Sequence, residues 1–367
     1  MSGPATAGAI PPAIHDDNDL GTTVLAQGSH STGPAPAGRT GLMSWPVRLP
    51  AARPQCPPDP YYARRVGSTP FRYQSPEEDS ARWLGFPFRD GDIVISTRSK
   101  TGTTWVQMIC ALLVFQTPEL PAPLGQLSPW LDHLIAPRGQ VYARLAAQQH
   151  RRFIKTHTPL DGIPLDPRAT YLVTARHPLD MAVSLYHQGG NIDRARVRQL
   201  TGQPGPAGPP PPRKPLHDWL PGWIASDDDP RQWPDSLPGV MRHLSGAWAR
   251  RGDPNVLLVH YDSLSADLEG QMRWLAGQLE IAVPQQAWPA LVQAATFESM
   301  RDSADTLVPT AGILKSNTAF FRRGTSGAGR EILSGEELAA YYARAAQLGT
   351  TRHAHLAPHL PPEPMNA

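Results

Sequence analysis

The sequence of 367 residues contains only two cysteines, which excludes a disulfide framework. Cys56 lies in a proline-rich stretch and Cys110 in an apolar segment far from it, so the pair does not form a metal-binding pattern. No apolar run is long enough to span a bilayer, and the N-terminus lacks the basic start and apolar core of a signal peptide. We therefore expect a cytoplasmic protein without a membrane span.

An excess of charge of one sign is also lacking. Lys and Arg total 34 against 32 Asp and Glu, which gives a formal net charge of +2. A chain this close to neutral is not expected to bind nucleic acid, although a local basic cluster could hold a small anionic ligand. The length allows one large α/β domain or two smaller ones.

Proline and glycine divide the chain. Residues 1–58 are rich in Gly, Ala and Pro and poor in large apolar side chains, so we expect a disordered leader. Residues 350–367 are expected to form a flexible tail, and residues 59–349 one folded domain. Within it, residues 202–238 combine dense prolines with Trp219, Trp223 and Trp233. We expect this segment to be an irregular lid or insertion.

Short β-branched runs alternate with helical patterns over the folded part. Strands are expected at 92–97, 152–156, 170–174 and 256–261. Helices are expected at 102–116, 141–149, 178–187, 239–251, 267–279, 286–295 and 334–348, the last with a capping box. This alternation predicts an α/β fold: a single domain with a central parallel sheet flanked by helices.

The turn after the first expected strand reads Lys100-Thr-Gly-Thr-Thr-Trp105 and leads directly into a helix. Backbone N–H groups and hydroxyls at a helix N-terminus bind anions, so we expect this turn to hold phosphate. It is not the nucleotide-triphosphatase loop, because the lysine precedes the glycine. The alternative is a polar turn in which Thr103 or Thr104 caps the helix.

The second expected strand ends in Lys155-Thr156-His157. In open α/β sheets the ligand crevice lies outside the carboxyl ends of the strands, so these side chains should approach Lys100. A histidine there can act as a general base, and a nearby cation helps to keep the imidazole neutral. The alternative is a structural or solvated histidine.

Two further clusters offer cations. Arg176 closes the third expected strand, and Ser184 lies two turns into the next helix, so both could reach one phosphate. Arg322-Arg323-Gly324 forms a basic, glycine-containing turn that could wrap a phosphate. Taken singly, each cluster could equally be surface charge.

In combination and order, these motifs resemble those of the PAPS-dependent sulfotransferase family, cytosolic type, from about Tyr61 to Leu348. The family's phosphosulfate loop is matched by Lys100 to Trp105, and its strand-end Lys-Thr-His by Lys155 to His157. Its 3′-phosphate element is matched by Ala175, Arg176, Pro178, Asp180 and Ser184, its tyrosine strand by residues 256–262, and its C-terminal loop by Arg322-Arg323-Gly324.

This resemblance implies a fold related to P-loop nucleotide kinases and 3′-phosphoadenosine-5′-phosphosulfate (PAPS) as sulfuryl donor, with no metal. It implies His157 as general base, assisted by Lys100 and Lys155. The 5′-phosphate would be held by Lys100, Thr101, Gly102, Thr103 and Thr104. The 3′-phosphate would be held by Arg176, Ser184, Arg322, Arg323 and Gly324, and the nucleoside by Trp105, Tyr261, Thr296 and Phe297.

The chain departs from the family pattern in several places. Arg98-Ser99 replaces the usual aromatic-proline pair, Ala295 replaces a threonine, and Arg323 replaces a lysine. The proline-rich segment 202–238 is longer than usual, so acceptor contacts cannot be transferred. The dimer motif of animal members is not recognisable, which leaves the oligomeric state open.

The acceptor is expected to be a small molecule with a hydroxyl group: a phenol, a lipid alcohol or a sugar. The tryptophans of segment 202–238, with Trp130, Phe88 and Tyr142, favour an aromatic or lipophilic pocket. The alanine, arginine and proline content is typical of a bacterial member. Two rival functions stay open at this stage: a nucleotide-dependent small-molecule kinase, and a non-catalytic nucleotide-binding protein.

Overall fold

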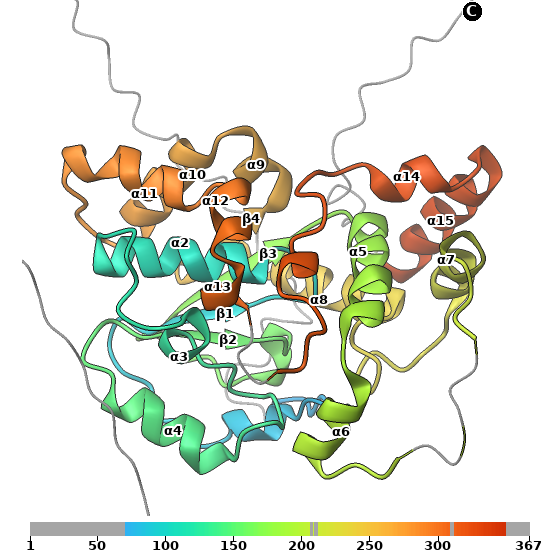
Figure 1. Cartoon of the computed structure of the whole chain (residues 1–367), viewed down its shortest axis with the longest axis horizontal. Coiled ribbons are helices and arrows are strands. Elements are labelled where there is room, and N and C mark those ends of the chain that lie inside the picture. The colour runs from blue at the N-terminus through green and yellow to red at the C-terminus, as the bar shows by residue number, and fades with distance from the viewer. Residues whose placement is uncertain (1–69, 206–207, 209–211, 309–311, 350–367) are drawn as a thin grey trace, which may run out of the picture. The chain divides into compact units, whose positions relative to one another are not determined.

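Four parallel strands form the centre of the fold, in the order β2-β1-β3-β4 (Figure 1). They are β1 (Ile93–Ser96), β2 (Phe153–Thr156), β3 (Thr170–Ala175) and β4 (Val256–His260). The computed structural model describes residues 70–205, 208, 212–308 and 312–349. The four predicted strands and the parallel sheet are confirmed, whereas the predicted leader (1–58) and tail (350–367) lie outside the described residues. Tyr261, predicted as the end of the last strand, begins a helix instead.

Each face of the sheet packs against its own set of helices. Ile93 and Ile95 point into one core with α2 (Thr103–Phe115), α10 (Leu268–Gln278) and α11 (Trp288–Ala294). Val94 points to the opposite core, which includes side chains from α4 (Arg138–Ala147) and α8 (Leu237–Ala249). Both faces are therefore buried, as expected of a parallel sheet, and this explains why its strands are apolar at successive positions.

A third apolar cluster joins helices around the C-terminal half. It contains side chains of α8 together with α5 (Pro178–Asn191), α7 (Leu216–Ala225), α14 (Ala328–Ile332) and α15 (Gly335–Leu348). The capping box predicted for the last of these is confirmed, because Ser334 and Glu337 exchange side chain-to-backbone hydrogen bonds. The other helical elements are α3 (Leu124–Leu127), α6 (Arg194–Thr201), α9 (Tyr261–Ala266), α12 (Phe297–Asp302), α13 (Ala304–Leu307), η1 (Ser80–Trp83), η2 (Leu160–Gly162), η3 (Gln285–Ala287) and η4 (Thr318–Phe320).

The segment 202–238 is not irregular throughout, so that prediction is wrong in part. Helix α7 lies inside it, with Pro215 as its N-cap and Pro221 within the helix. Proline is tolerated at a helix start, and a buried apolar face of Leu220, Trp223 and Ile224 offsets the hydrogen bond that Pro221 lacks. Helix α8 begins at Leu237, two residues before the predicted start at Gly239.

Two extended segments continue the sheet beyond β2. The backbones of Leu131 and Lys155 are hydrogen-bonded, and Trp130 pairs with Lys155 in parallel fashion. One step further out, Glu78 pairs with His133 in antiparallel fashion. These segments bring residues from before β1 and after α3 to the same sheet edge as the end of β2.

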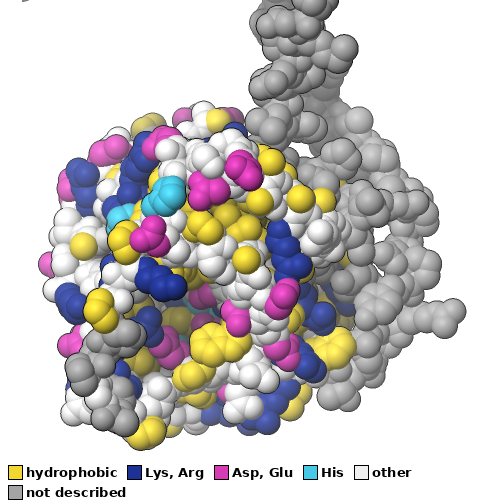
Figure 2. Space-filling model, turned by 90° about the vertical axis from the view of Figure 1, so that its right-hand side faces the viewer, with side chains coloured by type: hydrophobic (Ala, Val, Ile, Leu, Met, Phe, Trp, Pro, Cys, Tyr) yellow, Lys and Arg dark blue, Asp and Glu magenta, His cyan; other side chains and the backbone are white. Residues whose placement is uncertain are grey.

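Figure 2 shows acidic and basic side chains interspersed with hydrophobic ones on the face seen there. No single sign of charge dominates this face, as the near-neutral composition leads one to expect. No helix in the described part of the chain is long and apolar enough to cross a membrane.

Candidate active site

The loop after β1 leaves the first N–H groups of α2 free. Gly102, the N-cap, has φ 106° and provides no side-chain cap. Among the described residues, no group accepts a hydrogen bond from the backbone N–H of Thr103, Thr104 or Trp105. Uncapped N–H groups at the start of a long helix are an anion site. A side chain at Gly102 would be strained by its backbone and would lie 3.2 Å from the Tyr261 ring.

Lys100 also adopts the left-handed conformation, with φ 64°, which is uncommon for a non-glycine residue. Its Nζ lies 3.9 Å from the centre of the Phe320 ring and 3.5 Å from the Gln188 side-chain oxygen. Burial lowers the Lys100 pKa to about 7, together with the positive charges of Arg176, Lys155 and Arg322. Three further cations thus act on Lys100, which is the arrangement that a polyanionic ligand requires.

His157 follows β2 and is buried, with 4% of its surface exposed. Its Nδ1 lies 2.7 Å from the carbonyl oxygen of Thr97. A carbonyl only accepts, so Nδ1 carries the proton and Nε2 has a free lone pair. Burial lowers the pKa of His157 well below its usual value, and the charges of Lys155 and Arg98 act in the same direction. The imidazole is therefore neutral, as a general base must be.

A buried carboxylate fixes the backbone around this histidine. One oxygen of Asp132 accepts hydrogen bonds from the N–H groups of His157 and Thr158 and from the hydroxyls of Thr156 and Thr158. No sequence pattern indicates Asp132, because its role depends on the extended segment beside β2. Asp132 therefore fixes the backbone position at the end of β2.

Arg98, one of the departures from the family pattern, is tied to the same place. Its guanidinium is 1% exposed, donates to the carbonyl oxygen of His157, and pairs with Asp235 at 2.7 Å. The carboxylate of Glu78 lies 3.8 Å away. Arg98 therefore links the loop after β1, the end of β2 and the segment before α8, a role that the aromatic side chain usual at this position could not fill.

Arg176, which follows β3, lines the cavity and is held by backbone and ring contacts. It donates to the carbonyl oxygens of Lys100 and Thr325 and stacks on Tyr261, and its buried Nε has no partner among the described residues. Asp180 accepts hydrogen bonds from the N–H groups of Gly327 and Gly329, which fixes the C-terminal loop against α5.

The C-terminal loop itself is shaped by a glycine. Gly324 has φ 71°, and a Cβ there would lie 2.6 Å from the Phe297 ring, so only glycine fits. Arg323 is paired with the exposed Glu331 at 2.8 Å. Arg322 is exposed, and its charge acts on both Lys100 and Arg176.

Two predicted cofactor-binding residues do not line the cavity. The hydroxyl of Thr101 is hydrogen-bonded to the carbonyl oxygen of Arg98 and to the hydroxyl of Thr174. The backbone N–H of Thr101 donates to the same carbonyl oxygen. The hydroxyl of Thr296 caps α12. The indole N–H of Trp105 donates to the carbonyl oxygen of Ala295, which ties the start of α2 to the residue before Thr296.

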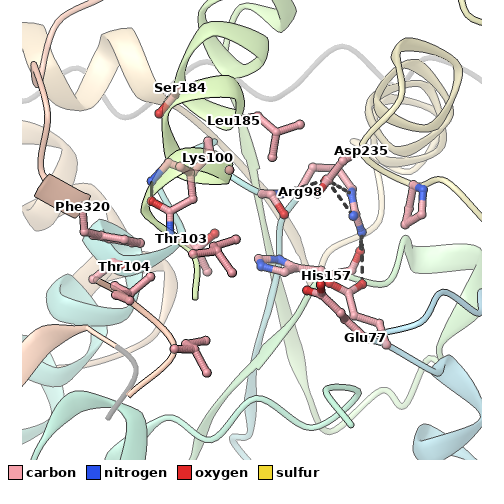
Figure 3. A pocket seen from close by; sticks show the side chains of 18 of the residues that line it. Glu77, Arg98, Lys100, Thr103, Thr104, His157, Ser184, Leu185, Asp235 and Phe320 are labelled. Carbon is pink, nitrogen blue, oxygen red and sulfur yellow. Dashed lines mark hydrogen bonds and ion pairs between the residues drawn. The ribbon is translucent and has the colours of Figure 1, made fainter. Parts of the chain in front are cut away.

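These elements surround one cavity of about 1460 Å³ (Figure 3). Lys100, Thr103, Thr104 and Phe320 lie on one side, and His157, Arg98 and Asp235 on the other. The predicted site residues that line it are Lys100, Gly102, Thr103, Thr104, Trp105, Lys155, His157, Arg176, Ser184, Tyr261, Phe297, Arg322, Arg323 and Gly324. Single drug-sized ligands occupy about 300–1,000 Å³, so this cavity has room for a nucleotide and a second molecule.

The aromatic wall differs from the prediction. Trp130, Trp219, Trp223 and Trp233 line the cavity. Phe88 and Tyr142 do not: Phe88 packs on Trp83 and Phe86, and the Tyr142 hydroxyl donates to a backbone carbonyl. The sequence pattern could not distinguish the two groups, because the same aromatic residue types occur in a buried core and in the wall of a pocket.

The donor set fits an adenosine bisphosphate. Free helix N–H groups, clustered cations and an arginine nitrogen without a hydrogen-bond partner among the described residues suit phosphates. Trp105, Tyr261 and Phe297 offer ring faces. The described residues contain no group of three or more His, Cys, Asp or Glu side chains that could hold a metal ion.

Comparisons with known proteins agree with this geometry. A family model described as the sulfotransferase domain matches residues 90–344. The chain is 41% identical over 302 residues to a glycolipid sulfotransferase of Mycobacterium bovis, covering 75% of this chain and 90% of that protein. It is 27% identical to human sulfotransferase 2B1 over 65% of this chain and 60% of that protein.

Solved structures share the fold. A mouse sulfotransferase complexed with PAP, the desulfated nucleotide, aligns with a TM-score of 0.56 and 16% identity, covering 75% of this chain and 90% of that one. A retinol dehydratase in complex with androsterone and PAP aligns with a TM-score of 0.52 and 20% identity, covering 73% of this chain and 83% of that one.

Proposed function

The chain belongs to the sulfotransferase family and is a PAPS-dependent sulfotransferase with a fold related to P-loop nucleotide kinases, and from this we propose its mechanism and its acceptor class. The acceptor is a hydroxyl of a lipid or similarly lipophilic molecule, and His157 is the general base. One observation carries the mechanism: His157 donates from Nδ1 to Thr97 and presents a free Nε2 in the cavity that also contains Lys100 and Lys155.

When bound, PAPS supplies the sulfuryl group and leaves as the bisphosphate. Nε2 of His157 takes the proton from the acceptor hydroxyl, which makes the oxygen nucleophilic. Lys100 and the N–H groups at the start of α2 stabilise negative charge on the leaving phosphate, and Lys155 stabilises charge on the sulfuryl oxygens. Arg176, Ser184 and Arg322 hold the 3′-phosphate. Positioning and electrostatics supply the catalysis, and no covalent intermediate with the protein is needed.

The lipid acceptor is supported by an apolar wall. Ile192 and Leu314 pair through their backbones and line the cavity with Val197, Leu307 and Ile313. A chain of methylene groups gains about 0.8 kcal/mol per buried CH₂, which is roughly a fourfold gain in affinity. The relatives at 40–41% identity are described as glycolipid sulfotransferases, which agrees with such a wall.

The acceptor class is tested with sulfur-labelled PAPS and a series of primary alcohols of increasing length, beside simple phenols. We expect kcat/KM to rise with chain length and to exceed that of phenols of equal size. If small phenols are sulfated best and chain length has no effect, the lipid acceptor is wrong. ATP in place of PAPS, with and without EDTA, should give no transfer, in contrast to a kinase.

A further inference from the structure

One carboxyl group beside Arg98, at the His157 side of the cavity, has no role in the mechanism above. Glu78 lines the cavity, and its side chain is 14% exposed. Among the described residues its carboxyl makes no hydrogen bond; its one ionic contact is Arg98 at 3.8 Å, and Arg98 has a closer partner in Asp235. Its oxygens therefore face the cavity with hydrogen-bonding capacity that a ligand can use.

Glu78 belongs to a ladder of side chains that begins at the catalytic lysine. The Lys155 ammonium lies 3.7 Å from the Trp130 ring centre. Trp130 stacks on His133 with centroids 3.9 Å apart, and His133 is the backbone partner of Glu78. Directly paired residues place their Cβ atoms about 4.5–5.5 Å apart on the same face, so Glu78 and His133 are neighbours. The ladder extends outward from the reaction centre along the sheet edge.

Like the Glu78 carboxyl, the His133 ring has no hydrogen bond among the described residues, although it is only 9% exposed and lines the cavity. Burial lowers the His133 pKa to about 3 and raises the Glu78 pKa to about 8. Both shifts favour the neutral form, in which each group can both donate and accept a hydrogen bond.

We infer that Glu78 and His133 form a headgroup subsite that binds a second hydroxyl of the acceptor, next to the one that is sulfated. The inference rests on the proposed function, because His157 and Lys155 already engage the reacting oxygen. A fatty alcohol or simple phenol has one polar atom and would leave both groups unpaired. A polyol headgroup, such as a sugar carried on a lipid chain, satisfies them.

The charged groups around Glu78 give no preference for a charged headgroup, because Lys155 and Arg98 are opposed by Asp132 and Asp235 in their effect on its pKa. A neutral hydroxyl is recognised by hydrogen bonds alone, which makes Glu78 a specificity-determining residue.

Binding to the PAP-loaded protein tests the subsite without requiring turnover. The probes are octyl β-D-glucoside, below its micelle concentration, and 1-octanol, which has the same chain but one hydroxyl. We expect the glucoside to bind tighter, and Glu78→Ala to weaken its binding about tenfold while changing octanol binding less than twofold. Glu78→Gln, whose amide also donates and accepts, should keep the glucoside within about threefold of wild type.

The control variant is Glu119→Ala, which removes an exposed carboxylate outside the cavity and should bind both probes as wild type does. The PAP affinity of every variant should also equal that of wild type. The subsite is wrong if wild type binds the glucoside no tighter than octanol, or if Glu78→Ala weakens both probes equally. If the glucoside binds as expected but receives no sulfate in the presence of PAPS, the proposed acceptor is wrong while the subsite stands.

Discussion

At the scale of single residues, the site uses burial to set protonation states. His157 is kept neutral by burial and by the cations beside it, so it is ready to accept a proton. The same burial disfavours the charge on Lys100, whose pKa is about 7 before an anion arrives. Burial also lowers the pKa of Lys155, to about 8, although the nearby carboxyl groups of Glu78 and Asp132 oppose this shift.

This predicts that nucleotide binding takes up protons. Above pH 7 the free protein has a largely neutral Lys100, whereas bound phosphate favours the ammonium form, so PAP affinity should fall as pH rises from 7 to 9. The slope should approach about tenfold per pH unit for one proton. Calorimetry at pH 8 in buffers of different ionisation enthalpy counts the protons.

Lys100→Arg is the matched variant, because a guanidinium stays protonated throughout this range. Its PAP binding should take up fewer protons than that of wild type and depend less on pH. An unchanged proton uptake in this variant would show that Lys100 is not the titrating group.

At the scale of elements, the site depends on contacts that join segments far apart in the sequence. Asp180 on α5 holds the loop that follows Gly324, and Arg98 joins the end of β2 to the segment before α8. Neither contact follows from local pattern. Within the segment 202–238, residues 216–225 are helical although the prolines indicated irregular structure, because α7 packs into the third apolar cluster.

Removing Asp180 should loosen the phosphate loop. Asp180→Ala leaves two backbone N–H groups without their acceptor, and we expect PAP affinity to fall about tenfold, as the loss of about 1–3 kcal/mol implies. Isothermal titration with PAP measures this. Glu331→Ala removes only an exposed ion pair with Arg323 and should have a smaller effect. An equal loss of PAP affinity in the two variants would contradict the role of Asp180 in holding the phosphate loop.

Breaking the Arg98–Asp235 pair should destabilise the fold more than it weakens nucleotide binding. We expect Asp235→Asn to lower the free energy of unfolding by about 1.5–3 kcal/mol, because a buried guanidinium loses its closest charged partner. Urea unfolding measures the change, and PAP affinity should stay within about threefold of wild type. A variant as stable as wild type would show that Glu78 and the His157 carbonyl suffice for Arg98.

At the scale of the whole molecule, the sheet explains how much the sequence could predict. Strands buried on both faces are apolar throughout, so all four could be located, and the loops after them had to meet at one edge. Helix ends shifted by a few residues because caps and tertiary packing decide them. The strand order, Asp132 and the subsite at Glu78 could not be predicted, since they depend on which segments pair beyond β2.

The central claim is that His157 is the base of a site already complete for its donor. Its most direct test is single turnover with sulfur-labelled PAPS and a long-chain acceptor that wild type sulfates, beside PAP binding by calorimetry. We expect His157→Ala to lower the transfer rate about 10²–10⁴-fold while PAP binds nearly as to wild type. A variant that transfers sulfate at close to the wild-type rate would contradict the account.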